Sequence, residues 1–320
     1  MTPARGTVVV AGAGGLIGTR LVASLVADGV PVRRLVRPGS DALARHADGV
    51  TPVAWDPDRG VLPEDALDGA AAVVNLGGVG IGDRRWTQRS RAVLRSSRLA
   101  GTGLLARELA RRGPDAPALV QASAMGFYGD RGDEPLPETA RRGDGFLADL
   151  VADWEAATDP ARDAGVRVVL LRTSLVLAPE GGALGRLLPL LRAGLGGPLG
   201  DGREFWSWIT LPDHVRAIRH LASSGVHGPV NLASPDPVRN AELTRAVARA
   251  LHRPAVLRVP APALHLALGG FAGDILASAR LVPRVLEADD FRWEHPRLAD
   301  AVAWLVADGR GRVLATPPAG

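Results

Sequence analysis

Three glycines spaced three residues apart stand near the start of the chain. They are Gly12, Gly15 and Gly18 in the segment AGAGGLIG, directly after the apolar run Thr7–Ala11. Glycine lets the backbone approach a diphosphate, which binds the free N–H groups and the positive dipole at the start of a helix. Glycines also end strands for packing reasons alone, but this context favours a dinucleotide loop. The residues that we expect to contact the cofactor here are Gly12, Ala13, Gly14, Gly15, Leu16, Ile17 and Gly18.

The end of the second predicted strand bears on which dinucleotide binds. The run VRRLVRPGS places Arg37 where a cofactor with a free 2′-hydroxyl usually meets an acidic residue. A guanidinium suits a 2′-phosphate through two hydrogen bonds, and no carboxylate stands nearby for a ribose diol. The sequence therefore predicts NADP rather than NAD, with Arg37 on the 2′-phosphate. The alternative is that Arg33, Arg34 and Arg37 only solvate an exposed strand end.

Two clusters combine arginine with tryptophan. Arg84, Trp86 and Arg98 follow the fourth predicted strand, and Trp206 belongs to a later region rich in glycine and proline. Guanidinium and indole groups together suit an anionic or planar substrate, so we predict that these four residues bind substrate. The alternative is that the tryptophans are packing residues and that Arg98 pairs with an acid inside the fold.

Alternating strands and helices must position these residues. Apolar runs predict strands at 7–11, 32–36, 50–54, 71–76, 118–122 and 166–171, and a long helix at 87–112. This alternation predicts an α/β fold with a Rossmann-type, doubly wound parallel sheet. From about Ala178 glycine and proline crowd the chain, which indicates a smaller C-terminal substrate lobe. We expect an NADP-binding core over 1–177 to which later segments return, the lobe over 178–310 and a flexible tail over 311–320.

The composition excludes several kinds of chemistry. The 320 residues include 38 basic and 34 acidic ones, every basic residue is arginine, and cysteine is absent. Without lysine and cysteine there is no Schiff-base lysine, thiol nucleophile or cysteine-ligated metal. The 7 histidines lack the HxxxH and HExxH spacings, so we expect no metal. The absence of cysteine is compatible with a cytoplasmic location, which we expect.

Two kinds of partner are disfavoured. Acidic residues are interspersed with the arginines and no basic tail is present, so we expect no nucleic acid. The apolar stretch 261–279 is interrupted by proline, glycine and aspartate, so we expect no membrane span. The expected partner is a small-molecule substrate.

Further segments resemble the blocks of one superfamily. Together with AGAGGLIG, the segments VNLGG (74–78), ASAMGFYG (122–129) and LLRTSLVL (170–177) resemble the extended short-chain dehydrogenase/reductase superfamily. The segments 81–98, 146–155 and 201–215 more narrowly resemble the epimerase family proteins, an NAD-dependent epimerase/dehydratase-like group with a C-terminal domain of unknown function. The resemblance covers residues 5 to about 305. It implies that Asn75, Leu76, Gly77 and Ser123 also contact the nicotinamide cofactor.

The catalytic pair of this superfamily is missing. Its members use a Ser or Thr with a YxxxK pair, in which the Tyr gives or takes a proton and the Lys lowers its pKa. Aligned on Glu155, the two positions of the pair hold Leu147 and Val151. The chain has 1 tyrosine, Tyr128, and we expect Tyr128 and Ser123 to be the catalytic residues.

Each replacement for the missing acid has an alternative. Asp149 and Glu155 are other candidates, and Tyr128 is equally compatible with a buried tyrosine whose hydroxyl is bonded. Hydride transfer itself is carried by the cofactor. We therefore expect an NADP-binding oxidoreductase or epimerase-like enzyme acting on an unidentified small molecule. The alternative is a non-catalytic NADP-binding sensor or interaction protein.

Overall fold

The chain folds into two compact units and passes between them several times. The computed structural model describes residues 6–44, 47–82, 86–268 and 270–313. The first unit comprises the chain up to 127 with 145–172 and 215–230, and the second comprises 128–144, 173–214 and the residues from 231 onward. Arg84, for which substrate binding is predicted, lies outside the described residues, as do positions 314–320 of the predicted tail.

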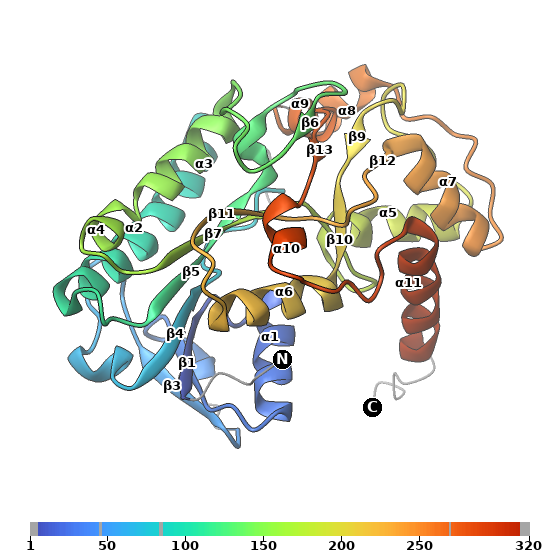
Figure 1. Ribbon diagram of the computed structural model, residues 1–320. Helices are drawn as coiled ribbons and strands as arrows, with labels where there is room; N and C mark the ends of the chain where they lie inside the picture. Colours follow the sequence, from blue (N-terminus) through green and yellow to red (C-terminus); the bar gives the residue numbers. More distant parts are fainter. Residues whose placement is uncertain (1–5, 45–46, 83–85, 269, 314–320) are drawn as a thin grey trace. The chain divides into compact units, whose positions relative to one another are not determined.

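The first unit is built on a seven-stranded sheet (Figure 1). Its elements are β1 (Thr7–Ala11), α1 (Leu16–Ala27), β2 (Val32–Val36), the 3-10 helix η1 (Asp41–Leu43), β3 (Val50–Ala54), the 3-10 helix η2 (Glu64–Leu67), β4 (Ala70–Asn75), α2 (Gln88–Arg112), β5 (Ala118–Ala124), α3 (Phe146–Ala156), α4 (Asp159–Asp163) and β7 (Val168–Thr173), with most of α6 (Leu211–Ser223) and of β11 (Gly228–Leu232). The strand order is β11-β7-β5-β4-β1-β2-β3. The pairs β1–β2, β2–β3, β1–β4 and β4–β5 are parallel.

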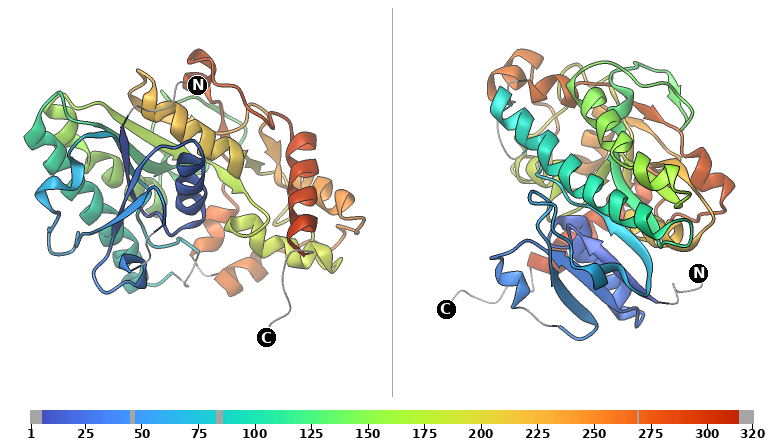
Figure 2. Two further views of the ribbon diagram at one scale, coloured as in Figure 1. Left: turned by 90° about the horizontal axis from the view of Figure 1, so that it is seen from below. Right: turned by 90° about the vertical axis from the view of Figure 1, so that its left-hand side faces the viewer.

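Helices cover both faces of this sheet. Figures 1 and 2 show α2, α3 and α4 together on one face and α1 with α6 on the other. Arg219 of α6 donates to Ser24 Oγ of α1 at 2.6 Å, which ties the second pair together. The β-branched residues of the central strands, such as Val9 and Val73, are fully buried because helices lie on either side. The predicted Rossmann-type, doubly wound parallel sheet is confirmed.

The strand order changes direction at β1. The chain runs outward from β1 to β2 and β3, and then returns to place β4 on the other side of β1. The loops after β1 and β4 therefore diverge at one edge of the sheet. Ligands of open α/β sheets bind at such a switch point, outside the carboxyl ends of the strands.

The second unit combines short strands with helices. Its elements are the end of the 3-10 helix η3 (Met125–Tyr128), β6 (Pro135–Leu136), β8 (Leu175–Leu177), α5 (Gly182–Arg192), β9 (Phe205–Trp206), β10 (Trp208–Thr210), β12 (Val238–Arg239), α7 (Asn240–Ala250), α8 (Ala261–Leu268), α9 (Phe271–Ile275), β13 (Arg280–Leu281), α10 (Arg284–Ala288) and α11 (Leu298–Val313). The strands pair as β10–β8, β12–β9 and β13–β6. Trp206, Trp208 and Leu243 belong to its buried apolar core.

Across the part of the chain that the structure describes, no helix has both the length and the apolar character that a membrane crossing needs.

Candidate functional site

A cavity of about 320 Å³ lies at the carboxyl edge of the sheet in the first unit. Its walls come from the glycine loop after β1, the end of β2 with the residues that follow, and the turn after β4. The side chain of Trp55 and the helix α2 complete it. The lining residues that were predicted as cofactor contacts are Gly12, Ala13, Gly14, Arg37, Asn75 and Gly77.

The glycines of the loop have different physical roles. Gly12 has φ +75°, and a Cβ there would lie 2.6 Å from the Leu76 carbonyl group. A Cβ at Gly18 would lie 2.3 Å from the Gly12 oxygen, so both positions need glycine for the fold itself. By contrast, a Cβ at Gly14 would meet nothing within 4 Å, and one at Gly15 would make only an ordinary contact at 3.5 Å. Gly14, which lines the cavity, and Gly15 therefore do not need to be glycine for the packing of the loop.

The first turn of α1 presents backbone donors beside this loop. Gly15 is the N-cap residue and provides no side-chain cap for the helix. Leu16, Ile17 and Gly18 form the first turn, in which backbone N–H groups have no partner within the helix. Such a helix start suits a phosphate group, because the unpaired N–H groups and the helix dipole both favour an anion.

Arginines stand at the other wall, within β2 and directly after it. Arg37 lines the cavity and forms an ion pair with Asp58, and both side chains are about half exposed, at 52% and 56%. Arg34 also lines the cavity and donates to the Ala42 carbonyl at 2.6 Å. An exposed pair of this kind contributes little, roughly 0–1 kcal/mol, so a ligand phosphate can replace Asp58 at small cost.

Asn75 shapes the turn after β4. The side chain is 1% exposed, and its Oδ1 accepts from the Gly77 N–H at 3.1 Å. Its amide nitrogen donates to Gln121 Oε1 at 2.9 Å and to Thr102 Oγ1 at 3.2 Å. The Leu76 N–H donates to the Ala11 carbonyl at 3.0 Å, which joins this turn to the end of β1. Asn75 thus holds the turn in place as well as lining the cavity.

Ser123, at the end of β5, belongs to a buried polar cluster. Its hydroxyl donates to Glu155 Oε1 at 2.6 Å. The carboxylate of Glu155 also accepts from Arg172 Nε and Nη2, each at 2.9 Å. Arg172 lies over the Phe127 ring, with its Cζ 3.5 Å from the ring centroid. From the sequence, Glu155 was considered only as an alternative acid, and Arg172 was not predicted. An arginine inside the apolar strand VVLLRT did indicate a buried charge that needs a partner.

Tyr128 lies in the second unit and is fully buried. Its hydroxyl donates to Asn231 Oδ1 at 2.7 Å, and Asn231 in turn donates to the carbonyl groups of Leu136 and Val282 at 3.0 Å each. Transfer of the Tyr128 proton to a ligand would require its release from Asn231. The catalytic role of Tyr128 stays a prediction, and the contacts present are those of a bonded core tyrosine.

The two predicted tryptophans have packing contacts. Trp86 donates to the Ile81 carbonyl at 3.0 Å, and its ring meets Phe146 edge-on at a centroid distance of 5.1 Å. Trp206 lies in the core of the second unit and donates to the Ile275 carbonyl at 3.3 Å. Their substrate contacts stay predictions. Arg98, the third of the described residues in this group, is buried on α2.

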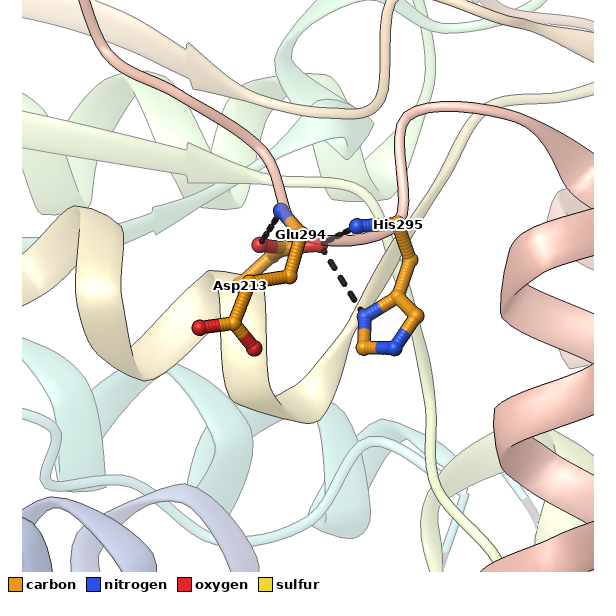
Figure 3. Close-up of side chains that lie close together, drawn as sticks. All are labelled: Asp213, Glu294 and His295. Atoms are coloured by element: carbon orange, nitrogen blue, oxygen red, sulfur yellow. Dashed lines mark hydrogen bonds and ion pairs between the residues drawn. The ribbon is translucent and has the colours of Figure 1, made fainter.

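One group in the second unit has the composition of a metal site. Asp213, Glu294 and His295 offer ligand atoms within 4.8 Å of one another (Figure 3). However, the Asp213 carboxylate accepts from the backbone N–H groups of Glu294 and His295, at 2.7 and 3.0 Å, and from the Thr210 hydroxyl at 3.0 Å. These bonds tie the start of α6 to the segment before α11. The cluster therefore has a structural explanation that needs no ion.

Comparison with known proteins agrees with this architecture. Residues 8–233 match the NAD dependent epimerase/dehydratase family, and residues 259–305 match a domain of unknown function, DUF1731. The chain is 42% identical over 303 residues to the epimerase family protein Mb2239 of Mycobacterium bovis, covering 94% of this chain and 98% of that protein.

Solved structures extend the comparison. A crystal structure of the human epimerase family protein SDR39U1 (isoform 2) with NADPH is similar with a TM-score of 0.83 and 30% identity, over 94% of this chain and 99% of that one. The UDP-glucose 4-epimerase of Thermus thermophilus, in complex with NAD, shares the fold at a TM-score of 0.75 and 21% identity, over 95% and 99% of the two chains. The resemblance inferred from the motifs is confirmed, and the chain belongs to the NAD dependent epimerase/dehydratase family, among the epimerase family proteins that carry a DUF1731 domain.

Proposed function

We propose that the chain binds NADPH in the cavity of the first unit and acts as an oxidoreductase or epimerase-like enzyme on a small molecule. The observation that carries the proposal is the chemistry of the cavity wall after β2. This wall contains Arg34, Arg37 and Ser40, the described lining residues include no carboxylate, and the Asp58 carboxylate beside them is paired with Arg37. A ribose with free hydroxyl groups usually meets an acid at this place, whereas a 2′-phosphate needs cations and hydroxyl donors.

The glycine loop supplies the second contact. Gly14 leaves open space before α1, and the N–H groups of its first turn would hold the diphosphate. The turn fixed by Asn75 closes the cavity on the other side of β1. The similarity to the human SDR39U1 structure with NADPH supports the same choice of cofactor.

When bound, the cofactor would supply or accept the hydride. On the protein side, Ser123 is the candidate for contact with the substrate because it stands at the carboxyl end of β5 and retains 4% exposure. Its proton is directed at the Glu155 carboxylate, which also accepts two hydrogen bonds from Arg172. The free lone pairs of Ser123 Oγ then suit a donor on the ligand, such as a substrate hydroxyl.

A specific observation favours a second candidate function. Leu147 and Val151 stand at the positions of the usual Tyr and Lys, and the hydroxyl of Tyr128 is engaged with Asn231. A protein that lacks the usual catalytic pair would bind NADPH as a sensor or interaction protein, without turnover of a substrate.

Two measurements on the purified chain test the proposal. Calorimetric titrations with NADPH and NADH come first, and a clear preference for NADPH is expected. Deuteride transfer from labelled NADPH is then followed over a panel of carbonyl compounds and sugar nucleotides. Binding with transfer supports the enzyme, binding without any transfer supports the sensor, and absence of binding by either cofactor refutes the assignment of the cavity.

A further inference from the structure

Arg98 is a buried cation for which the described part of the chain provides no anion. The residue is 7% exposed on α2, and its Nη1 donates to the Leu94 carbonyl at 3.1 Å, one turn earlier in the same helix. The guanidinium lies over the Trp154 ring, 5.0 Å from its centroid. Among the residues that the structure describes, no carboxylate pairs with Arg98.

Two other arginines of the first unit have several acceptors. The buried Arg172 binds both oxygens of Glu155, and the partly buried Arg167 donates to the carbonyl groups of Leu221, Ala222 and Val226 at 2.9–3.0 Å. Removing a charge from water is costly unless an opposite charge or several acceptors replace the water. Burial lowers the pKa of Arg98 to about 10, which reflects this cost while leaving the group charged at neutral pH. Within the described part of the chain, Arg98 therefore lacks the anion or the set of acceptors that a buried guanidinium needs.

The remaining donors of Arg98 lie near the cavity. Among the described residues Nε and Nη2 have no hydrogen-bond acceptor, and neither is among the atoms that are both fully buried and unpaired. The side chain lies against Gly78, where a Cβ would be 3.3 Å from its Cγ and 3.4 Å from its Cζ. Gly78 lines the cavity, as do Ser97 and Gly101 on either side of Arg98 in α2. The guanidinium thus stands beside the cavity at the turn after β4.

This end of the cavity lies away from the predicted 2′-phosphate site. In the sheet β1 stands between β2 and β4, so the glycine loop separates Arg37 from the Gly78 turn. A dinucleotide with its 2′-phosphate at β2 and its diphosphate on the loop would extend toward β4 and β5. The substrate would meet it on that side, where α3 also brings Trp154, which faces Arg98, next to Glu155, which binds Ser123.

We propose that Arg98 is the receptor for an oxyanion of the substrate, a carboxylate or a phosphate group. The proposal rests on the proposed function, because it takes the neighbouring cavity to be the NADPH site. It limits the unidentified substrate to anionic compounds. A planar carboxylate or a phosphate would accept hydrogen bonds from two N–H groups of the guanidinium and would supply the negative charge.

Calorimetry on the NADPH-saturated protein tests the proposal, with inorganic phosphate and malonate as probes. In the saturated protein NADPH occupies the glycine loop and the Arg37 wall. Binding of a probe therefore reports on a separate site. The test variant is Arg98→Met, which keeps an apolar stem over Trp154 and removes the charge. The control is Arg95→Met on the same helix, where an exposed arginine pairs with Asp153. Thermal unfolding of both variants verifies that they fold.

The wild type and the Arg95→Met variant should bind at least one probe saturably, and Arg98→Met should bind it at least tenfold more weakly with NADPH affinity unchanged. Equal probe binding by Arg98→Met, or no probe binding by the wild type, would overturn the proposal. A parallel loss of NADPH affinity in Arg98→Met would assign the cation to the cofactor's diphosphate instead. Failure of the wild type to bind NADPH at all is a different result and refutes the proposed function.

Discussion

The hydroxyl of Ser123 donates a 2.6 Å hydrogen bond to the Glu155 carboxylate, and both residues are more than nine-tenths buried. The carboxylate is held in turn by two hydrogen bonds from Arg172, itself 4% exposed. A buried carboxylate with a bidentate arginine has a fixed orientation, so the direction of the Ser123 proton is fixed as well. The cluster places one oriented hydroxyl at the carboxyl end of β5.

The buried pair makes a prediction about stability. Glu155→Gln should lower the free energy of unfolding by about 3–5 kcal/mol, because it leaves the Arg172 guanidinium buried without an opposite charge. The double variant Glu155→Gln with Arg172→Met should recover part of this loss, since it removes the unpaired charge. Urea unfolding of the wild type, the two single variants Glu155→Gln and Arg172→Met, and the double variant at pH 7 measures the effect. Additive losses in the double variant would contradict the coupling.

The same cluster makes a prediction about activity. Ser123→Ala should reduce deuteride transfer from labelled NADPH to a responsive substrate by roughly 10- to 100-fold, because the oriented acceptor for the ligand is lost. The dissociation constant for NADPH should change less than about threefold. Ser174→Ala is the matched control, because Ser174 is also a buried serine and donates to the Leu232 carbonyl at 2.7 Å. Equal rates of deuteride transfer in the two variants would show that Ser123 has no role in the reaction.

Cofactor preference should depend on Arg37. Arg37→Ala should weaken NADPH binding by about tenfold or more and leave NADH binding nearly unchanged, since a charge-assisted hydrogen bond contributes about 1.5–3 kcal/mol. Asp58→Ala should act in the opposite direction, because it releases Arg37 from its ion pair before the phosphate arrives. Calorimetric titrations of the three proteins with both cofactors measure this. An equal loss for NADPH and NADH in Arg37→Ala would refute the assigned role.

The strands could be located from the sequence because short β-branched runs stand between turn residues; the buried β1 is a continuous apolar run, as is typical of a central parallel strand. The predicted strands 7–11, 32–36 and 50–54 coincide with β1, β2 and β3. The seventh strand, β11, was not predicted, because its sequence GPVNL is short and its place in the sheet depends on the chain returning from the second unit.

Contacts between residues far apart in the chain also could not be predicted from local sequence patterns. The residue types of Glu155 and Arg172 were visible, but their contact depends on how α3 packs on the sheet. The acceptor of the Tyr128 hydroxyl is Asn231, 103 residues later. The sequence therefore showed which side chains could do chemistry, whereas the structure was needed to show which of them already have partners.

Two glycines of the loop should affect different properties, Gly15 cofactor binding and Gly12 folding. Gly15→Val should abolish binding of both NADPH and NADH and leave the melting temperature within a few degrees, because its φ is −78° and a Cβ there makes only an ordinary contact at 3.5 Å. Gly12→Val should instead impair folding, since its φ is +75° and a Cβ would lie 2.6 Å from the Leu76 carbonyl group. Thermal unfolding and calorimetry on both variants distinguish the cases. Normal binding by a folded Gly15→Val variant would defeat the diphosphate assignment.

The pH dependence of stability should contain a contribution from His214. This residue is 1% exposed, its Nε2 lies 3.1 Å from Thr173 Oγ1, and burial lowers its pKa from 6.5 to about 3. Between these two pKa values the unfolded chain binds the proton that the folded chain excludes, so stability rises with pH in this window. The contribution is complete above about pH 6.5 and falls by about 1.4 kcal/mol for each unit as the pH drops toward 3.

A variant without the titrating group isolates this contribution. His214→Gln keeps a polar side chain near Thr173 but cannot take up a proton, and other groups act equally in both proteins. One of these is Glu138, whose pKa is raised by burial and whose contribution has the opposite sign. From pH 7 to pH 5 the wild type should lose about 2 kcal/mol more than His214→Gln in urea unfolding experiments. Equal losses would mean that His214 is protonated in the folded protein as easily as in the unfolded chain, which its burial beside Thr173 opposes.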